Sequence, residues 1–113
     1  MDLKILSRDE IFSKDPRGRE PGGSNYLAMY SSTFGGVVKD PALMVIPLDE
    51  HMVHRGDGIF EAFECVNGNL YNFDAHLSRL QKSAKLASLD LPFNLETIKE
   101  ITIKTVAIAG VRD

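Results

Sequence analysis

The sequence is poor in cysteine and tryptophan and lacks long apolar runs. It holds one cysteine, Cys65, and no tryptophan. A single cysteine excludes an intramolecular disulfide and suits a reducing compartment. No apolar run approaches the roughly 20 residues of a membrane-spanning helix, and the opening MDLKILSRDEIF lacks the apolar stretch of a secretory signal peptide. We therefore expect a cytoplasmic protein that does not have a membrane as partner.

The sequence also lacks an excess of positive charge. Its 13 basic and 16 acidic side chains give a net charge of −3 and a pI near 5.6, so nothing favours nucleic acid as a partner. The histidines His51, His54 and His76 do not share a helix-face spacing, and no metal site is predicted. A composition of 43% hydrophobic and 26% charged residues over 113 positions is typical of one globular domain.

A stretch rich in proline, glycine and charge, KDPRGREPGGSN, divides the chain. Such a composition buries too little apolar surface to order itself. We therefore predict a flexible N-terminal arm and linker over residues 1–25, with a short helix or an irregular segment in Met1–Phe12. A folded domain is predicted over residues 26–113.

The first part of this domain predicts a hairpin followed by a strand and a loop. A strand over Tyr26–Phe34 is expected to turn at Gly35-Gly36 into Val37-Val38. The apolar run Met44–Pro47 predicts a further short strand. The polar, glycine-bearing stretch Asp49–Gly58 predicts a loop that presents side chains rather than burying them.

A second hairpin has the clearest local pattern. Ile59–Val66 alternates between two faces, which predicts a strand, although each face carries one acid, Glu61 or Glu64. Asn67-Gly68 favours a type I′ turn because both of its positions need positive φ. Asn69–Phe73 is the predicted return strand.

Two helices are predicted after this hairpin. Asp74 is a suitable N-cap for a helix over Ala75–Ser88, and Asn94 for a helix over Leu95–Ala109, which Gly110 ends. Each helix has one apolar stripe. The predicted fold class is therefore α+β, a small antiparallel sheet of hairpins with two helices packed on one face.

The order of three motifs is more specific than any one of them. HRGDGIFE ends the polar loop, Asn67-Gly68 follows within a hairpin, and DAHLSRLQKSAK covers the cap and most of the predicted helix Ala75–Ser88. In this order, the region from His51 to about Pro92 resembles the N-terminal domain of fold-type-IV pyridoxal 5′-phosphate enzymes. That family contains D-amino-acid and branched-chain aminotransferases and aminodeoxychorismate lyase. The resemblance implies pyridoxal 5′-phosphate as cofactor, an amino acid and a 2-oxo acid as substrates, and a homodimer.

The resemblance also assigns roles to individual residues. Arg79 in HLSRL is the expected ligand of the cofactor phosphate, and its planar guanidinium suits phosphate because it donates two parallel hydrogen bonds. The substrate pocket is expected to include Arg55, Phe60 and Glu61. Arg55 would bind a substrate carboxylate, Phe60 would form an aromatic wall, and Glu61 would influence proton affinities. His76 matches a family histidine and is given no catalytic role.

From the residues alone, other interpretations stay open. Arg79 can be a solvated residue at the edge of the apolar helix stripe, Phe60 a core residue and Glu61 a surface carboxylate. None of the lysines has the sequence context of the family's Schiff-base lysine, which lies in a second domain, so the 113-residue chain alone is expected to be inactive. The chain is then part of an aminotransferase, part of an aminodeoxychorismate lyase-like enzyme, or a non-catalytic module that binds a ligand or a protein.

Overall fold

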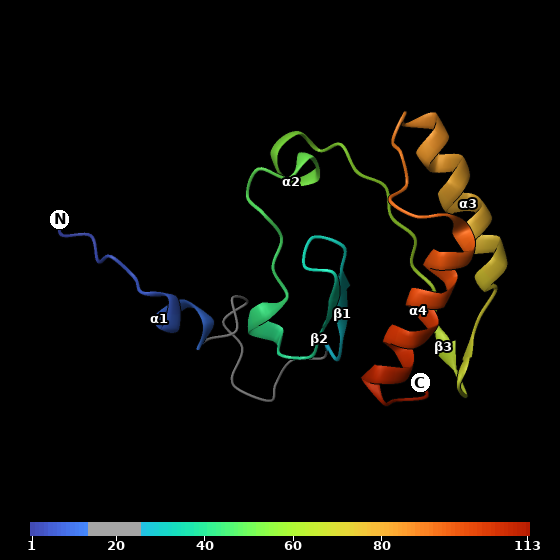
Figure 1. Cartoon of the computed structure of the whole chain (residues 1–113), viewed down its shortest axis with the longest axis horizontal. Helices are drawn as coiled ribbons and strands as arrows, with labels where there is room; N and C mark the ends of the chain where they lie inside the picture. The colour runs from blue at the N-terminus through green and yellow to red at the C-terminus, as the bar shows by residue number, and fades with distance from the viewer. Residues whose placement is uncertain (14–25) are drawn as a thin grey trace. The chain divides into compact units, whose positions relative to one another are not determined.

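A computed structural model describes residues 1–13 and 26–113, which form two compact units, Met1–Val45 and Ile46–Asp113 (Figure 1). Helices and antiparallel strand pairs are both present, and the predicted α+β class is confirmed. The hairpins form two separate two-stranded sheets rather than one sheet. The linker stretch KDPRGREPGGSN, residues 14–25, lies outside the described residues, and the domain boundary there stays a prediction.

The first unit begins with a short helix, α1 (Arg8–Phe12). A capping box starts it, because the Ser7 side chain accepts from the backbone N–H of Glu10 while the Glu10 carboxylate accepts from the backbone N–H of Ser7. Of the two forms predicted for the start of the chain, a helix is therefore present over its second half. A 3₁₀ turn, η1 (Pro41–Leu43), also belongs to this unit.

The hairpin of the first unit is shorter than predicted. It pairs β1 (Met29–Ser31) with β2 (Gly36–Val38), so most of the predicted strand Tyr26–Phe34 lies outside the ladder. The turn occupies residues 32–35 and includes Gly35 at φ 70°, a left-handed conformation that glycine adopts without strain. The opposed residues are Met29 and Val38, Tyr30 and Val37, and Ser31 and Gly36.

The prediction of a strand and a loop between the hairpins was wrong. Residues 44–47 form no strand, and α2 (His51–Arg55) lies within the predicted loop Asp49–Gly58. Its N-cap is Glu50, whose carboxylate accepts from the backbone N–H of Met52 at 2.7 Å, and Gly56 ends the helix at φ 75°. Two local capping signals thus make one helical turn from a polar stretch.

The second unit continues with an extended segment, residues 57–64, that leads into β3 (Cys65–Val66) and β4 (Asn69–Leu70). The predicted I′ turn is confirmed, with Asn67 at φ 52° and Gly68 at φ 78°. The predicted strand Ile59–Val66 is paired only over its last two residues. Within the described part of the chain, no strand lies beside the rest, and a β-ladder needs such a partner.

Two helices complete this unit, α3 (Phe73–Leu86) and α4 (Leu95–Ala109). The bounds of α4 are as predicted, with Asn94 accepting from the backbone N–H of Thr97 and Gly110 in the left-handed conformation. For α3 the predicted N-cap was wrong. The cap is Asn72 at φ 50°, and no cap hydrogen bond from its side chain is present.

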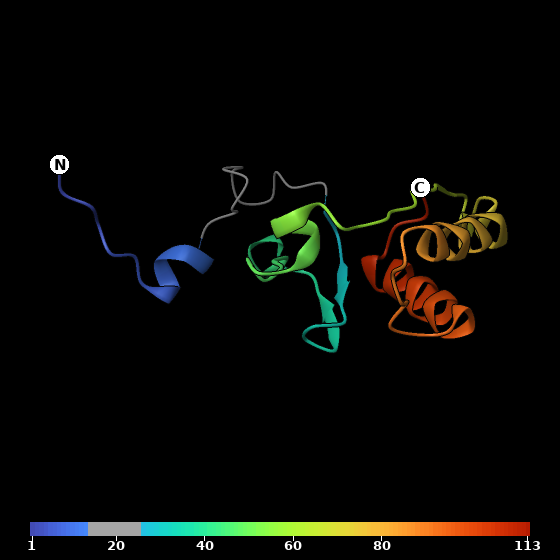
Figure 2. The same ribbon diagram turned by 90° about the horizontal axis from the view of Figure 1, so that it is seen from above.

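Asp74, the predicted cap, lies in the first turn of α3, where its carboxylate accepts from Lys99 Nζ of α4 at 2.6 Å. The two helices lie side by side (Figure 2). Helix α3 buries Phe73, Leu77 and Ala84, which form the apolar core of the second unit. Among the described residues, no helix has the length and apolar character needed to cross a membrane.

Candidate functional site

The extended segment before β3 keeps the two-face alternation of its sequence. Ile59, Glu61, Phe63 and Cys65 are half-buried, whereas the residues between them are exposed. The ring of Phe63 packs against α3, with centroid distances of 5.1 Å to Phe73 and 5.4 Å to the imidazole of His76. Because Glu61 lies two residues before Phe63 on the same face, its carboxylate is also directed toward α3.

The Glu61 carboxylate is held by two side chains of α3. Arg79 Nε donates to Oε1 at 2.8 Å and Arg79 Nη2 donates to Oε2 at 2.8 Å, a bidentate pair. His76 Nδ1 lies 2.7 Å from the same Oε2. The exposed fraction of the Glu61 side chain is 10%, against 17% for His76 and 65% for Arg79. We call these three residues the Glu61 cluster.

The electrostatics of this cluster favour the ionised carboxylate. Its hydrogen bonds with Arg79, and next those with His76, lower the pKa of Glu61 from 4.5 to about 2. The same pairing raises the pKa of Arg79 above its ordinary value. An ionised carboxylate can only accept, so His76 Nδ1 carries a proton toward Glu61. Arg79 Nη2, 3.2 Å from that nitrogen, therefore has no acceptor there.

The lowered pKa of Glu61 predicts a loss of stability in acid. The folded-state pKa of Glu61 lies below its ordinary value of 4.5. The contribution of Glu61 to the free energy of unfolding is therefore complete above pH 4.5 and is lost as the pH falls toward 2. The ¹³C shift of the Glu61 carboxyl carbon should accordingly titrate near pH 2, and urea unfolding should become easier between pH 4.5 and 2. In Glu61→Gln this acid-dependent loss should shrink.

The matched control for this experiment is Glu64→Gln. Glu64 is exposed, lies on the opposite face of the same segment and is outside the Glu61 cluster. Its replacement should therefore leave the pH dependence closer to that of the unchanged chain. Equal changes in the two variants would contradict the role given to the Glu61 cluster.

The guanidinium of Arg79 fits a phosphate as one of its ligands. Arginine has five N–H donors, and Glu61 accepts from Nε and from one hydrogen of Nη2. No acceptor bonds to Nη1 within residues 1–13 and 26–113, and the side chain is 65% exposed. The edge formed by Nη1 and Nη2 thus remains accessible, and this edge can donate two parallel hydrogen bonds to an oxyanion.

The other predicted pocket residues do not join this cluster. Arg55 is the exposed last residue of α2, and Phe60 is 86% exposed on the face of its segment opposite Glu61. The structure therefore brings two predicted site residues together, Glu61 and Arg79. It adds His76, for which the sequence predicted no catalytic role.

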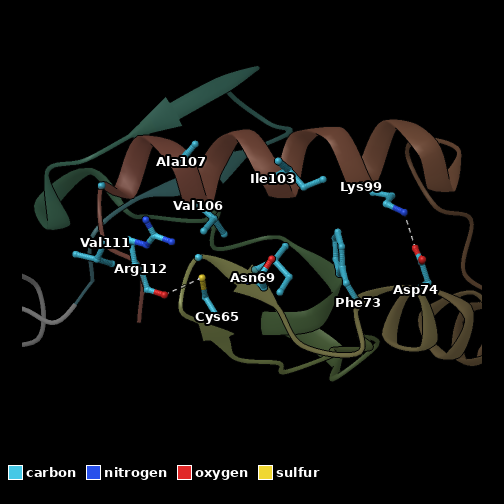
Figure 3. A pocket seen from close by; sticks show the side chains of 13 residues that line it. Cys65, Asn69, Phe73, Asp74, Lys99, Ile103, Val106, Ala107, Val111 and Arg112 are labelled. Carbon is cyan, nitrogen blue, oxygen red and sulfur yellow. Dashed lines mark hydrogen bonds and ion pairs between the residues drawn. The ribbon is translucent and has the colours of Figure 1, made fainter.

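A separate cleft of about 740 Å³ lies between α4, the β3–β4 hairpin and the start of α3 (Figure 3). The ion pair of Lys99 with Asp74 lies at one end of it and Arg112 at the other, with apolar side chains such as Ile103 and Val106 between. Glu61, His76 and Arg79 do not line this cleft. In the described part of the chain, no group of three or more histidine, cysteine or carboxylate side chains is arranged to hold a metal ion.

The family model and the similar proteins both point to aminotransferases. The model of the family described as Amino-transferase class IV matches residues 58–113, a range that includes the Glu61 cluster and Phe60 but not Arg55. The D-amino-acid transaminase, chloroplastic, of Arabidopsis thaliana is 54% identical over 111 residues, which are 98% of this chain and 29% of that protein. No solved structure is significantly similar to the chain.

More distant relatives bear related names. The D-alanine aminotransferase of Bacillus licheniformis is 30% identical over 71% of this chain and 28% of its own length. The bifunctional aminodeoxychorismate lyase / D-amino acid transaminase of Mycobacterium tuberculosis is 33% identical over 66% of this chain and 27% of its own length. The chain thus spans less than a third of each of these relatives.

Proposed function

Because the chain belongs to the amino-transferase class IV family, whose members use pyridoxal 5′-phosphate, we propose that the protein transfers an amino group between a D-amino acid and a 2-oxo acid. The observation that carries this proposal is the 54% identity to a D-amino-acid transaminase across 98% of the chain. At that identity the side chains of a site are usually shared as well as the fold. The D-alanine aminotransferase from Bacillus licheniformis supports the same class of donor.

In this proposal the chain contributes one side of the cofactor site. Arg79 holds the phosphate through Nη1 and the second hydrogen of Nη2, the donors of this 65% exposed side chain that Glu61 does not use. When bound, pyridoxal phosphate withdraws electrons from the α-carbon of the amino acid, and this weakens the bond to the α-hydrogen. Exposed Phe60 and Arg55 are proposed to contact substrate, with Arg55 binding a carboxylate.

The assembled protein is proposed to be a homodimer in a reducing compartment such as the cytoplasm. The thiol of Cys65 supports the second point, because it is free and only half-buried.

A lyase activity on aminodeoxychorismate is the second candidate, since one relative carries both activities in its name. A non-catalytic module of the same fold is the third.

An amino-donor assay separates these candidates. The protein as its gene encodes it is purified, supplied with pyridoxal 5′-phosphate and 2-oxoglutarate, and offered D-alanine, L-alanine, L-leucine or aminodeoxychorismate. We expect pyruvate from D-alanine with equimolar glutamate, and little product from either L-amino acid. Pyruvate from aminodeoxychorismate without glutamate would favour the lyase, and an absence of any product would favour the module.

A further inference from the structure

Glu61 is an unusual acid for its place in the sequence. It lies on the half-buried face of an alternating segment, between Ile59 and Phe63, where an apolar residue would pack at no cost in desolvation. An acid with a 10% exposed side chain needs partners, and here it has three donors on two residues. The arrangement therefore indicates that the Glu61 carboxylate has a function in addition to packing.

Resting on the proposed function, we infer that Glu61 is a positioning residue for the phosphate ligand Arg79. It fixes Nε and Nη2 of the guanidinium and so leaves the Nη1 and Nη2 edge directed away from the carboxylate, available to an oxyanion. A long, 65% exposed arginine side chain would otherwise sample many rotamers. Fixing it before the ligand arrives removes part of the entropy cost of binding.

The carboxylate that orients Arg79 is itself held in place. His76 Nδ1 donates to Oε2 at 2.7 Å, and the imidazole packs against the ring of Phe63 at 5.4 Å with 39° between the planes. Phe63 in turn packs against buried Phe73 of α3. The support thus runs from the core through Phe63 and His76 to Glu61, and from there to the exposed guanidinium.

Glu61 also has an opposing electrostatic effect. Its negative charge partly neutralises Arg79 and repels a bound phosphate, so removing the charge changes two properties at once. Glu61→Asp separates them, because it keeps the charge and shortens the side chain by one carbon, which breaks the bidentate geometry. We therefore expect weaker phosphate binding in Glu61→Asp although no charge is lost.

The first test uses the unchanged protein, as its gene encodes it, labelled with ¹⁵N at arginine. Inorganic phosphate is added and then pyridoxal 5′-phosphate, each followed by NMR. We expect the Nη signals of Arg79 to shift while its Nε–H signal, bonded to Glu61, stays in place. A large shift of the Nε–H signal would mean that the phosphate displaces Glu61, and this would overturn the inference without the need for a variant.

The second test is a double-mutant cycle in the affinity for pyridoxal 5′-phosphate. Glu61→Asp is expected to weaken binding about three- to tenfold, and this effect should vanish when Arg79→Ala is already present. An effect that persists in the Arg79→Ala background would assign Glu61 a structural role only. If Arg79→Ala weakened the binding of pyridoxal 5′-phosphate and Glu61→Asp did not, the positioning role of Glu61 would be overturned, whereas the cofactor role of Arg79 would stand.

The same cycle also tests the proposed function separately. If Arg79→Ala binds both phosphate compounds as well as the unchanged protein, or if the unchanged protein binds neither, the cofactor role of Arg79 fails and the positioning role fails with it. Pyridoxal without its phosphate is the control ligand, and its affinity should be the same in all four proteins of the cycle.

Discussion

Replacing Leu77 by alanine is expected to lower the free energy of unfolding by about 2–5 kcal/mol, which is the usual cost of deleting a buried leucine side chain. Leu77 is 7% exposed and lies in the middle of α3, between buried Phe73 and Ala84. The core of this unit is small, so deleting Leu77 removes a large share of its buried apolar contacts. Urea unfolding followed by circular dichroism at 222 nm measures the change.

Leu86→Ala is the matched control, because it makes the same chemical change on the same helix. Leu86 is 89% exposed, and its replacement should alter the free energy of unfolding by less than about 0.5 kcal/mol. A loss in Leu86→Ala as large as that in Leu77→Ala would mean that exposure in this chain does not reflect packing. A negligible loss in Leu77→Ala would show that α3 does not form the core.

The parts of the fold that are coded locally could be predicted from the sequence. The bounds of α4 followed from Asn94 and Gly110, since each acts on the backbone within one turn of the helix. The I′ turn followed from Asn67-Gly68 for the same reason. The capping box at α1 was also present as Ser7 and Glu10, three residues apart, and attention to that spacing would have placed the helix start.

The parts that depend on distant partners were harder to predict. The alternation of Ile59–Val66 correctly gave the two faces, but pairing over most of that length needs a neighbouring strand, which the described residues do not supply. The start of α3 was misplaced because Asn72 takes the left-handed conformation and Phe73 begins the helix as a buried residue. These two features, rather than side-chain capping at Asp74, determine where α3 begins.

The site could be predicted in part. The resemblance pointed to Glu61 and Arg79 separately, but it did not indicate that they pair, because their contact joins residues 18 positions apart. A signal for the pairing was nevertheless present. An acid on the apolar face of an alternating segment needs donors, and the next helix carries His76 and Arg79 three residues apart, on neighbouring positions of one face.

Replacing Arg79 by alanine is expected to weaken binding of pyridoxal 5′-phosphate about ten- to one-hundredfold, the range for losing charged hydrogen bonds. Two causes act in the same direction. The phosphate loses the donors of the Nη1 and Nη2 edge, and the Glu61 carboxylate, left without its arginine, repels the phosphate more strongly. Titration followed by absorbance or calorimetry, at fixed salt concentration, measures the affinity of the protein as its gene encodes it.

Two variants separate the effect of the planar donor geometry of Arg79 from the effect of its positive charge. Arg79→Lys keeps the positive charge but cannot donate to Glu61 and to a phosphate from one rigid plane, so it should recover only part of the affinity. Lys82→Ala removes a positive charge from an exposed position one turn further along α3 and should change the affinity less than about twofold. If Lys82→Ala weakened binding as much as Arg79→Ala, a diffuse positive potential would explain the data. If Arg79→Lys bound as tightly as the unchanged protein, a point charge would be enough, and the bidentate geometry fixed by Glu61 would have no part in holding the phosphate.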